Sequence, residues 1–210
     1  DDVSAMAGAD AFRIHPRCGE YLLLEDCPAY TVRHPIFQVP TAAGKGIVVS
    51  RTVDGNILVG PTADDVPEKD YLVTTADGLR RVLAGARRSI PALQTRMVIT
   101  EFTGERAVIA GHDDFLVGPG NVPGFFNAAG IKSPGLTAAP AIAEELVALM
   151  DRTGLSQTLN PEFRPENERV PLFRECTPEQ QEKMIAGDPR YGRIVCRCET
   201  VTEGDIVRAI

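Results

Sequence analysis

The sequence predicts an α+β fold, in which a mostly antiparallel sheet with flanking helices is followed by a small, partly helical module. Short apolar segments bounded by Pro and Gly dominate the first 60 residues, as in sheets built from short strands. Two later segments, 75–90 and 137–150, carry apolar residues at the helical period. A length of 210 residues, 43% of them hydrophobic, suffices for one sizeable core and an appendage.

The first β elements are expected in the N-terminal quarter of the chain. The segments expected to form strands here are 20–24, 31–39 and 46–49. Asp54-Gly55 lies between the apolar runs 47–53 and 56–59. Asp-Gly tolerates the positive φ angles of a tight hairpin turn, so we expect these two runs to pair antiparallel.

The segment 75–90 is expected to be a helix. Thr74 and Asp77 form a potential capping pair at its start, and Pro91 ends it. Its apolar stripe consists of Leu79, Val82, Leu83, Ala86 and Ile90. Two strand-like segments, 97–100 and 107–109, follow it.

A buried strand at 125–129 is expected to lead through a glycine-containing turn into a second helix at 137–150, which Gly154 ends. After Gly154 the chain becomes rich in Pro, Asn, Glu and Arg, which indicates a linker at 155–175. Capping patterns then predict short helices that begin near Thr177 and Thr202.

Charge and composition exclude several classes of function. The formal net charge of −7 and a pI near 5.0 argue against a nucleic-acid partner, because phosphate binding needs a clustered basic surface. No apolar run approaches the ~20 residues needed to span a bilayer, so we expect no transmembrane segment. Five cysteines, an odd number, favour a reducing compartment, and we expect a cytoplasmic location.

Three features are candidates for chemistry. The turn 130–136 leads from a strand into a helix, where free backbone N–H groups can hold an anion or an electron-rich ring edge. A plain strand–turn–helix corner has the same pattern, and the usual dinucleotide motif G-x-G-x-x-G is absent. Arg106, after Gly104, is expected at the mouth of a sheet, where its guanidinium can bind a carboxylate or phosphate in two-pronged fashion, although a solvated surface arginine has the same pattern.

The third feature is the pair Cys196 and Cys198. A tetrahedral zinc site and a [2Fe–2S] cluster each need four ligands, which two thiolates cannot supply. Either two further ligands lie beyond Ile210, or the two residues are an exposed thiol pair without a metal.

Several segments in order resemble a known family. Residues 10–21, ending in Pro-Arg-Cys-Gly-Glu-Tyr, resemble the start of the substrate domain of the FAD-dependent D-amino-acid-oxidase superfamily. Residues 54–61 resemble its strand signature, 102–106 its G-x-R motif, and 130–140 its flavin-facing turn and helix. Residues 194–202 are similar to the opening of a bacterioferritin-associated-ferredoxin-like [2Fe–2S] module, which is appended to anaerobic-type glycerol-3-phosphate dehydrogenases.

This resemblance implies roles for individual residues. Arg106, at the G-x-R position, would engage the anionic group of a small substrate, and no catalytic residue is assigned. The residues implied at the flavin are Gly130, Ile131, Lys132, Ser133, Gly135 and Leu136. Cys196 and Cys198 would be ligands of a [2Fe–2S] cluster. The implied reaction is hydride transfer from a substrate C–H bond to FAD, with electrons leaving through the cluster or to an acceptor subunit.

The resemblance also divides the chain. It implies a substrate-binding domain at 1–122, a strand and helix of the FAD domain at 123–154, the linker at 155–175, and an incomplete [2Fe–2S] module at 176–210. The chain does not begin with Met and ends at Ile210, where a helix is expected to have just begun, so we expect an excised part of a longer protein. Such a part would lack the pyrophosphate-binding motif and the second cysteine pair, hold neither cofactor and be inactive alone.

Three functions remain open at this point. The first is oxidation of glycerol 3-phosphate or a similar small anionic alcohol, with membrane association through a partner as an alternative to a purely cytoplasmic location. The second is oxidation of a 2-hydroxy acid or an amino acid, although Val48 replaces a histidine that related L-2-hydroxyglutarate oxidases carry. The third is a non-catalytic metal-binding or interaction module.

Overall fold

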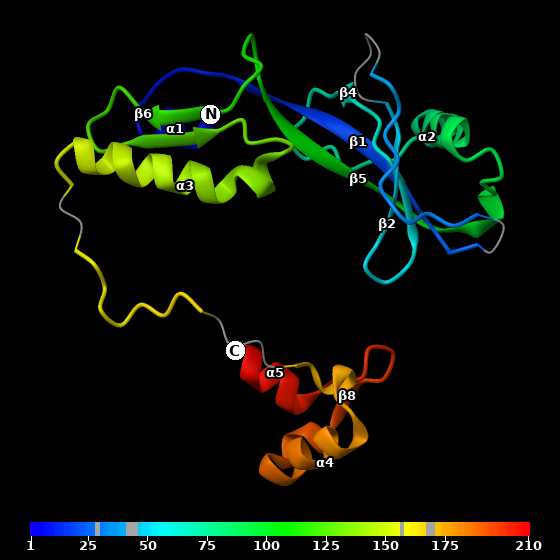
Figure 1. The fold of residues 1–210 in the computed structure, drawn as a ribbon. Helices are drawn as coiled ribbons and strands as arrows, with labels where there is room; N and C mark the ends of the chain where they lie inside the picture. The colour runs from blue at the N-terminus through cyan, green and yellow to red at the C-terminus, as the bar shows by residue number, and fades with distance from the viewer. Residues whose placement is uncertain (28–29, 41–45, 156–157, 167–170) are drawn as a thin grey trace. The chain divides into compact units, whose positions relative to one another are not determined.

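The computed structural model describes residues 1–27, 30–40, 46–155, 158–166 and 171–210 (Figure 1). The chain forms two compact units, Asp1–Gln157 and Thr158–Ile210, which are described separately below. Both contain helices and antiparallel strands, so the expected α+β class is confirmed. The finer boundaries at residues 122 and 154 stay predictions, and part of the expected linker, 156–157 and 167–170, lies outside the described residues.

The N-terminal unit is built around a five-stranded sheet. After a short helix, α1 (Asp2–Met6), the central strand β1 (Ile14–Leu24) pairs on one side with β3 (Ile57–Gly60) and β4 (Asp64–Asp65). Strand β2 (Val48–Arg51) pairs with β3, and β5 (Val98–Ile109) pairs with the other side of β1. All these pairs are antiparallel, and β1 and β5 run side by side along their whole lengths (Figure 1).

The hairpin predicted at Asp54-Gly55 is confirmed. Val49 pairs with Val59 across it, and Gly55 has a φ of 97°, which favours glycine. By contrast, the strand expected at 31–39 is wrong: within it only Ile36 bridges to Val49. Pro35 lacks a backbone donor, which interrupts a hydrogen-bonded ladder.

The two strand-like segments at 97–100 and 107–109 are one strand, β5, which corrects the prediction. Polar residues between them hid its continuity, because pairing with β1 satisfies the backbone whatever the side chains are. Strand β1 begins at Ile14, six residues before the expected start at Glu20, because its polar first half is also paired through the backbone with β5.

The core lies between the sheet and helix α2 (Ala76–Ser89). Val82 and Ala86 of α2 are fully buried against the sheet residues Val49, Ile57 and Val59. The helix predicted at 75–90 is therefore confirmed, but its cap is Thr75 and not Thr74: the Thr75 hydroxyl oxygen accepts a hydrogen bond from Gly78 N.

A second layer of this unit consists of the paired strands β6 (Leu116–Pro119) and β7 (Phe126–Ala129) and of helix α3 (Gly135–Arg152), which lies along them (Figure 1). Strand β7 was expected to be buried, yet only Asn127 of its residues is. Helix α3 was expected from 137 to 150 and begins two residues earlier, at Gly135. Gly135 is also its only buried residue.

The C-terminal unit contains helices α4 (Pro178–Gly187) and α5 (Glu203–Ala209) and the strand pair β8 (Ile194–Cys196) and β9 (Val201–Thr202). Both predicted helix starts are confirmed, since Thr177 and Thr202 each form a complete capping box. Asp205 is buried and also accepts a hydrogen bond from Phe173 N at 3.3 Å. Throughout the part of the chain that the structure describes, no helix is long and apolar enough to cross a membrane.

Candidate functional site

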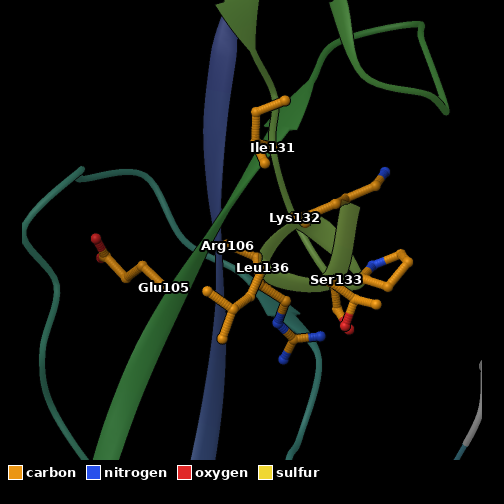
Figure 2. Close-up of a pocket in the computed structure, with 9 residues that line it drawn as sticks. Glu105, Arg106, Ile131, Lys132, Ser133 and Leu136 are labelled. Atoms are coloured by element: carbon orange, nitrogen blue, oxygen red, sulfur yellow. The ribbon is translucent and has the colours of Figure 1, made fainter. Parts of the chain in front are cut away.

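Two adjoining pockets of the N-terminal unit bring the predicted site residues together. One, of about 430 Å³, lies between Arg106 on β5 and the start of α3 (Figure 2). The other, of about 580 Å³, lies over the sheet. Arg106, Lys132 and Ser133 line both. The structure thus places Arg106 beside the turn 130–136, two segments that are well separated in the sequence.

Arg106 lies within β5, directly opposite Arg17 of β1, and not at the mouth of the sheet as expected. Strand β5 pairs only with β1 among the described strands, so it is an edge strand, and Arg106 is half-buried within it. The Arg106 Nη2 donates a 2.6 Å hydrogen bond to the carbonyl oxygen of Thr62. Glu105, the preceding residue, points away from the guanidinium group in Figure 2.

The positive charge of Arg106 has no carboxylate partner in the part of the chain that the structure describes. Among the described residues, no carboxylate lies within ion-pair distance of Arg106 or of Lys132. The other two cations at the larger pocket, Arg17 and Arg81, are each held by a carboxylate. The pocket therefore offers an anion two free cations.

The two neutralised cations form two-pronged ion pairs. Arg17 donates from Nε to Asp65 at 2.6 Å and from Nη2 at 3.0 Å. Arg81 donates from Nη1 to Asp64 at 3.0 Å and from Nη2 at 2.8 Å. The hydrogen bonds from these arginines lower the pKa of both carboxyl groups, so both stay ionised and keep Arg17 and Arg81 occupied.

The start of α3 is left open towards the smaller pocket. Its N-cap residue, Pro134, has no side chain that can accept a hydrogen bond from the helix. Gly135 N donates to Lys132 O, whereas Leu136 N and Thr137 N have no acceptor among the described residues. Both residues line the pocket. These free N–H groups, at the positive end of an 18-residue helix, suit an electron-rich ring edge or an anion.

The turn before α3 depends on two glycines. Gly130 has a φ of +66°, and a Cβ there would lie 2.6 Å from the Ile109 side chain. A Cβ at Gly135 would lie 2.4 Å from Cγ2 of Ile131. A larger residue at either position would move the turn: Gly130 lets the backbone pass close to the end of β5, and Gly135 lets α3 begin close to Ile131.

The larger pocket also has an apolar wall that sequence reasoning missed. Phe37, Ile47, Val48 and Val108 line it. Tyr21 lines it too and stacks on Phe102 with ring centroids 5.0 Å apart. No local motif marks this wall, because it comes from segments that only the sheet brings together.

In the C-terminal unit, Cys196 ends β8 and is half-buried, while Cys198 is exposed in the following turn. Thr200 in the same turn has a positive φ of 51°, which is unusual for a β-branched residue. All five cysteines are free thiols. Within the described ranges, no group of three or more His, Cys, Asp and Glu side chains is placed to hold a metal ion. The two thiols alone therefore do not make a metal site.

Comparisons with known proteins find similar chains. The family described as FAD dependent oxidoreductase (DAO) matches residues 1–149. A glycerol 3-phosphate dehydrogenase of Caloramator mitchellensis is 39% identical over 211 residues, which covers 100% of this chain and 44% of that protein. A glycerol 3-phosphate oxidase of Mycoplasma genitalium is 38% identical over 144 residues, 68% of this chain and 38% of the oxidase.

Among solved structures, the dithionite-reduced L-α-glycerophosphate oxidase of Mycoplasma pneumoniae with FAD bound has a TM-score of 0.71 and 34% identity. The match covers 77% of this chain and 42% of that one. A proline dehydrogenase of P. horikoshii, at 21% identity and a TM-score of 0.59, shares the fold, and the match covers 71% of this chain and 39% of that one. The chain thus spans less than half the length of each of these four relatives.

Proposed function

The chain belongs to the FAD dependent oxidoreductase family, and from this premise we propose that it is the substrate-binding part of a dehydrogenase. The substrate is glycerol 3-phosphate or a similar small anionic alcohol. The whole enzyme would include a nucleotide-binding half that holds the pyrophosphate of FAD.

The observation that carries this proposal is the uncompensated positive charge at Arg106 and Lys132, beside the open start of α3. A guanidinium group with free donors binds a phosphate through two parallel hydrogen bonds. A phosphate monoester carries up to two negative charges near neutral pH, so a second cation at Lys132 matches it better than it matches a carboxylate. This favours glycerol 3-phosphate over a 2-hydroxy acid or an amino acid.

The residues around α3 fit one edge of a flavin. Leu136 N and Thr137 N have no acceptor within the described ranges, and Gly130 and Gly135 let the backbone approach closely. The positive end of the helix favours negative charge. A flavin held there would supply the hydride acceptor for the substrate carbon that bears the hydroxyl group. The groups of this chain then have three tasks: they bind the phosphate, orient the alcohol carbon, and exclude water along the apolar wall of the larger pocket.

We also propose that the C-terminal unit passes electrons onwards. Cys196 and Cys198 would supply two ligands of a [2Fe–2S] cluster, and the other two would come from chain beyond Ile210. The Caloramator dehydrogenase aligns over this whole unit, whereas the aligned part of the M. genitalium oxidase covers 68% of this chain. An extra electron-transfer unit is what a dehydrogenase with a separate acceptor needs. That acceptor would be a further subunit, in the cytoplasm or at a membrane surface.

The test is replacement of Arg106 in the complete, flavin-loaded enzyme. Arg106→Ala should lower kcat/KM for glycerol 3-phosphate by about 10–100-fold, because a charge-assisted hydrogen bond contributes about 1.5–3 kcal/mol. Arg106→Lys should recover only part of this, since an ammonium group cannot make the two-pronged contact. The visible flavin spectrum should not change.

Two controls separate this role from a general loss of structure. Arg88→Ala removes an exposed arginine of α2 that does not line either pocket, and kcat/KM should stay within about twofold. Glycerol, which lacks the phosphate, should be oxidised by wild type and Arg106→Ala with equal, low kcat/KM. If Arg106→Ala leaves the preference for glycerol 3-phosphate over glycerol intact, the substrate assignment is wrong.

A further inference from the structure

Gly19 lies in the interior of β1, where glycine is unfavourable and its backbone angles do not require it. A glycine inside a strand weakens it and marks a place where another group approaches closely. Among the described residues, the glycines with positive φ are those at 8, 46, 55, 60, 111, 118, 124, 130 and 154, so Gly19 is not one of them. Its neighbours in the strand carry side chains to both faces of the sheet.

The group that approaches Gly19 is the guanidinium of Arg106. A Cβ built on Gly19 would lie 2.3 Å from Arg106 Nη2, 2.7 Å from Pro61 Cβ and 3.2 Å from the carbonyl oxygen of Thr62. Across the strand pair, Gly19 is opposite Gly104, and a Cβ on Gly104 would meet nothing within 4 Å in the described residues. The guanidinium therefore passes over the bare Cα of Gly19 on its way to Thr62.

The acceptor at the end of this path is held firmly. Thr62 is 4% exposed, its hydroxyl oxygen accepts from Glu20 N at 3.1 Å, and its own N donates to Glu20 O at 3.3 Å. Two arginines directly opposite each other on a sheet repel. Asp65 holds Arg17 by its two-pronged pair, and Thr62 O holds Arg106.

We infer that Gly19 is a positioning residue for substrate binding: its missing side chain lets Arg106 lie flat against β1, with Nη2 on Thr62 O and its remaining donors free for the substrate's phosphate. This inference rests on the function proposed above. A methyl group at residue 19 occupies the position of Nη2, so the guanidinium must leave Thr62 O and turn out of the plane in which it meets the phosphate. The position of the anion, and with it that of the alcohol carbon, then changes.

The experiment is a double-mutant cycle in the complete, flavin-loaded enzyme, made of wild type, Gly19→Ala, Arg106→Ala and the double variant. Two quantities are measured for each: the Kd of dihydroxyacetone phosphate, the ketone product, from its perturbation of the flavin absorbance, and kcat/KM for glycerol 3-phosphate. Gly19→Ala should raise Kd about 5–30-fold in wild type and less than about twofold in Arg106→Ala. Gly204→Ala, whose Cβ would lie 2.6 Å from the Tyr191 ring in the C-terminal unit, is a control with a similar steric clash and should leave Kd unchanged.

The outcomes separate this inference from the proposed function. If Gly19→Ala weakens binding equally in both backgrounds, the glycine acts through its packing against Pro61, and the inference is wrong. It is also wrong if Gly19→Ala has no effect where Arg106→Ala has a large one, although the proposed function then stands. If Arg106→Ala itself changes nothing, the proposed function fails. Should Gly19→Ala not fold, recovery of folded, flavin-loaded protein on adding Arg106→Ala supports the inference, and failure to recover refutes it.

Discussion

The buried carboxylate of Glu20 is the clearest target for a stability experiment. Glu20 is 4% exposed and lies on the face of β1 opposite to that of Arg17 and Tyr21. It accepts hydrogen bonds from Thr75 N at 2.7 Å and from Thr75 Oγ1 at 2.9 Å, at the start of α2. The carboxylate of Glu20 also lies close to the backbone of α2, because a Cβ on Gly78 would lie 1.9 Å from Glu20 Oε1. The carboxylate thus joins the central strand to α2, the helix that carries Arg81 to the larger pocket.

Glu20→Ala removes two hydrogen bonds to a charged group, each of which contributes about 1.5–3 kcal/mol. It also removes a negative charge at a helix N-terminus, which contributes about 0.3–1 kcal/mol. Because the Thr75 hydroxyl keeps its bond with Gly78 N, we expect a loss of about 3–5 kcal/mol in the free energy of unfolding. Glu20→Gln keeps one acceptor oxygen, so about 1–2 kcal/mol should be lost, which lowers Tm by roughly 2–8 °C in a unit of this size.

The measurement is urea unfolding of the chain, followed by far-ultraviolet circular dichroism, for wild type and both variants. Glu101→Gln, an exposed carboxylate on β5, is the matched control and should change the free energy of unfolding by less than about 0.5 kcal/mol. Equal midpoints for Glu20→Gln and Glu101→Gln would show that the carboxylate of Glu20 does not hold α2 to the sheet.

Further predictions concern the cofactors and the C-terminal unit. The 210-residue chain alone should not retain FAD, since it lacks the G-x-G-x-x-G motif for the pyrophosphate, and stoichiometric yellow flavin absorbance in the purified chain would refute this. In this chain, Cys196 and Cys198 should react with a thiol reagent faster than the two buried thiols of the N-terminal unit. In the complete enzyme, prepared anaerobically, replacing either cysteine by Ser should abolish the visible absorbance of a [2Fe–2S] cluster. Burial opposes ionisation of Asp205, but hydrogen bonds from Thr202 and Phe173 N outweigh it and lower its pKa. A carboxyl group whose pKa is lowered in the folded state stabilises the fold at pH values above its unfolded pKa of about 3.9, and this stabilisation is lost as the pH falls through the folded-state pKa. Asp205→Asn should therefore lower the free energy of unfolding by about 1–3 kcal/mol near neutral pH and by progressively less in acid. An equal loss at all pH values would contradict this.

Much of the secondary structure could be predicted because its signals are local. The Asp54-Gly55 hairpin follows from two residues that accept positive φ, and the helix at 76–89 follows from an apolar stripe that repeats every three to four residues. The capping boxes at Thr177 and Thr202 likewise involve residues only three positions apart. The failures came where pairing between distant segments decides the structure: polar residues between Thr100 and Ala107 belong to a strand only because β1 lies beside them.

For the site, the sequence by itself determined which residue types are present: an arginine two positions after a glycine, a glycine-rich turn before a helix, and a closely spaced cysteine pair. Family resemblance supplied their expected roles. Only the tertiary structure decided that Arg106 and the start of α3 line the same pocket, and that Asp64 and Asp65 neutralise Arg81 and Arg17. It also decided that Thr62 holds the guanidinium in the space that Gly19 leaves. The physical reason is that charge compensation and close approach depend on distances between atoms. Arg106 reaches Thr62 O across Gly19 only once β5 has paired with β1.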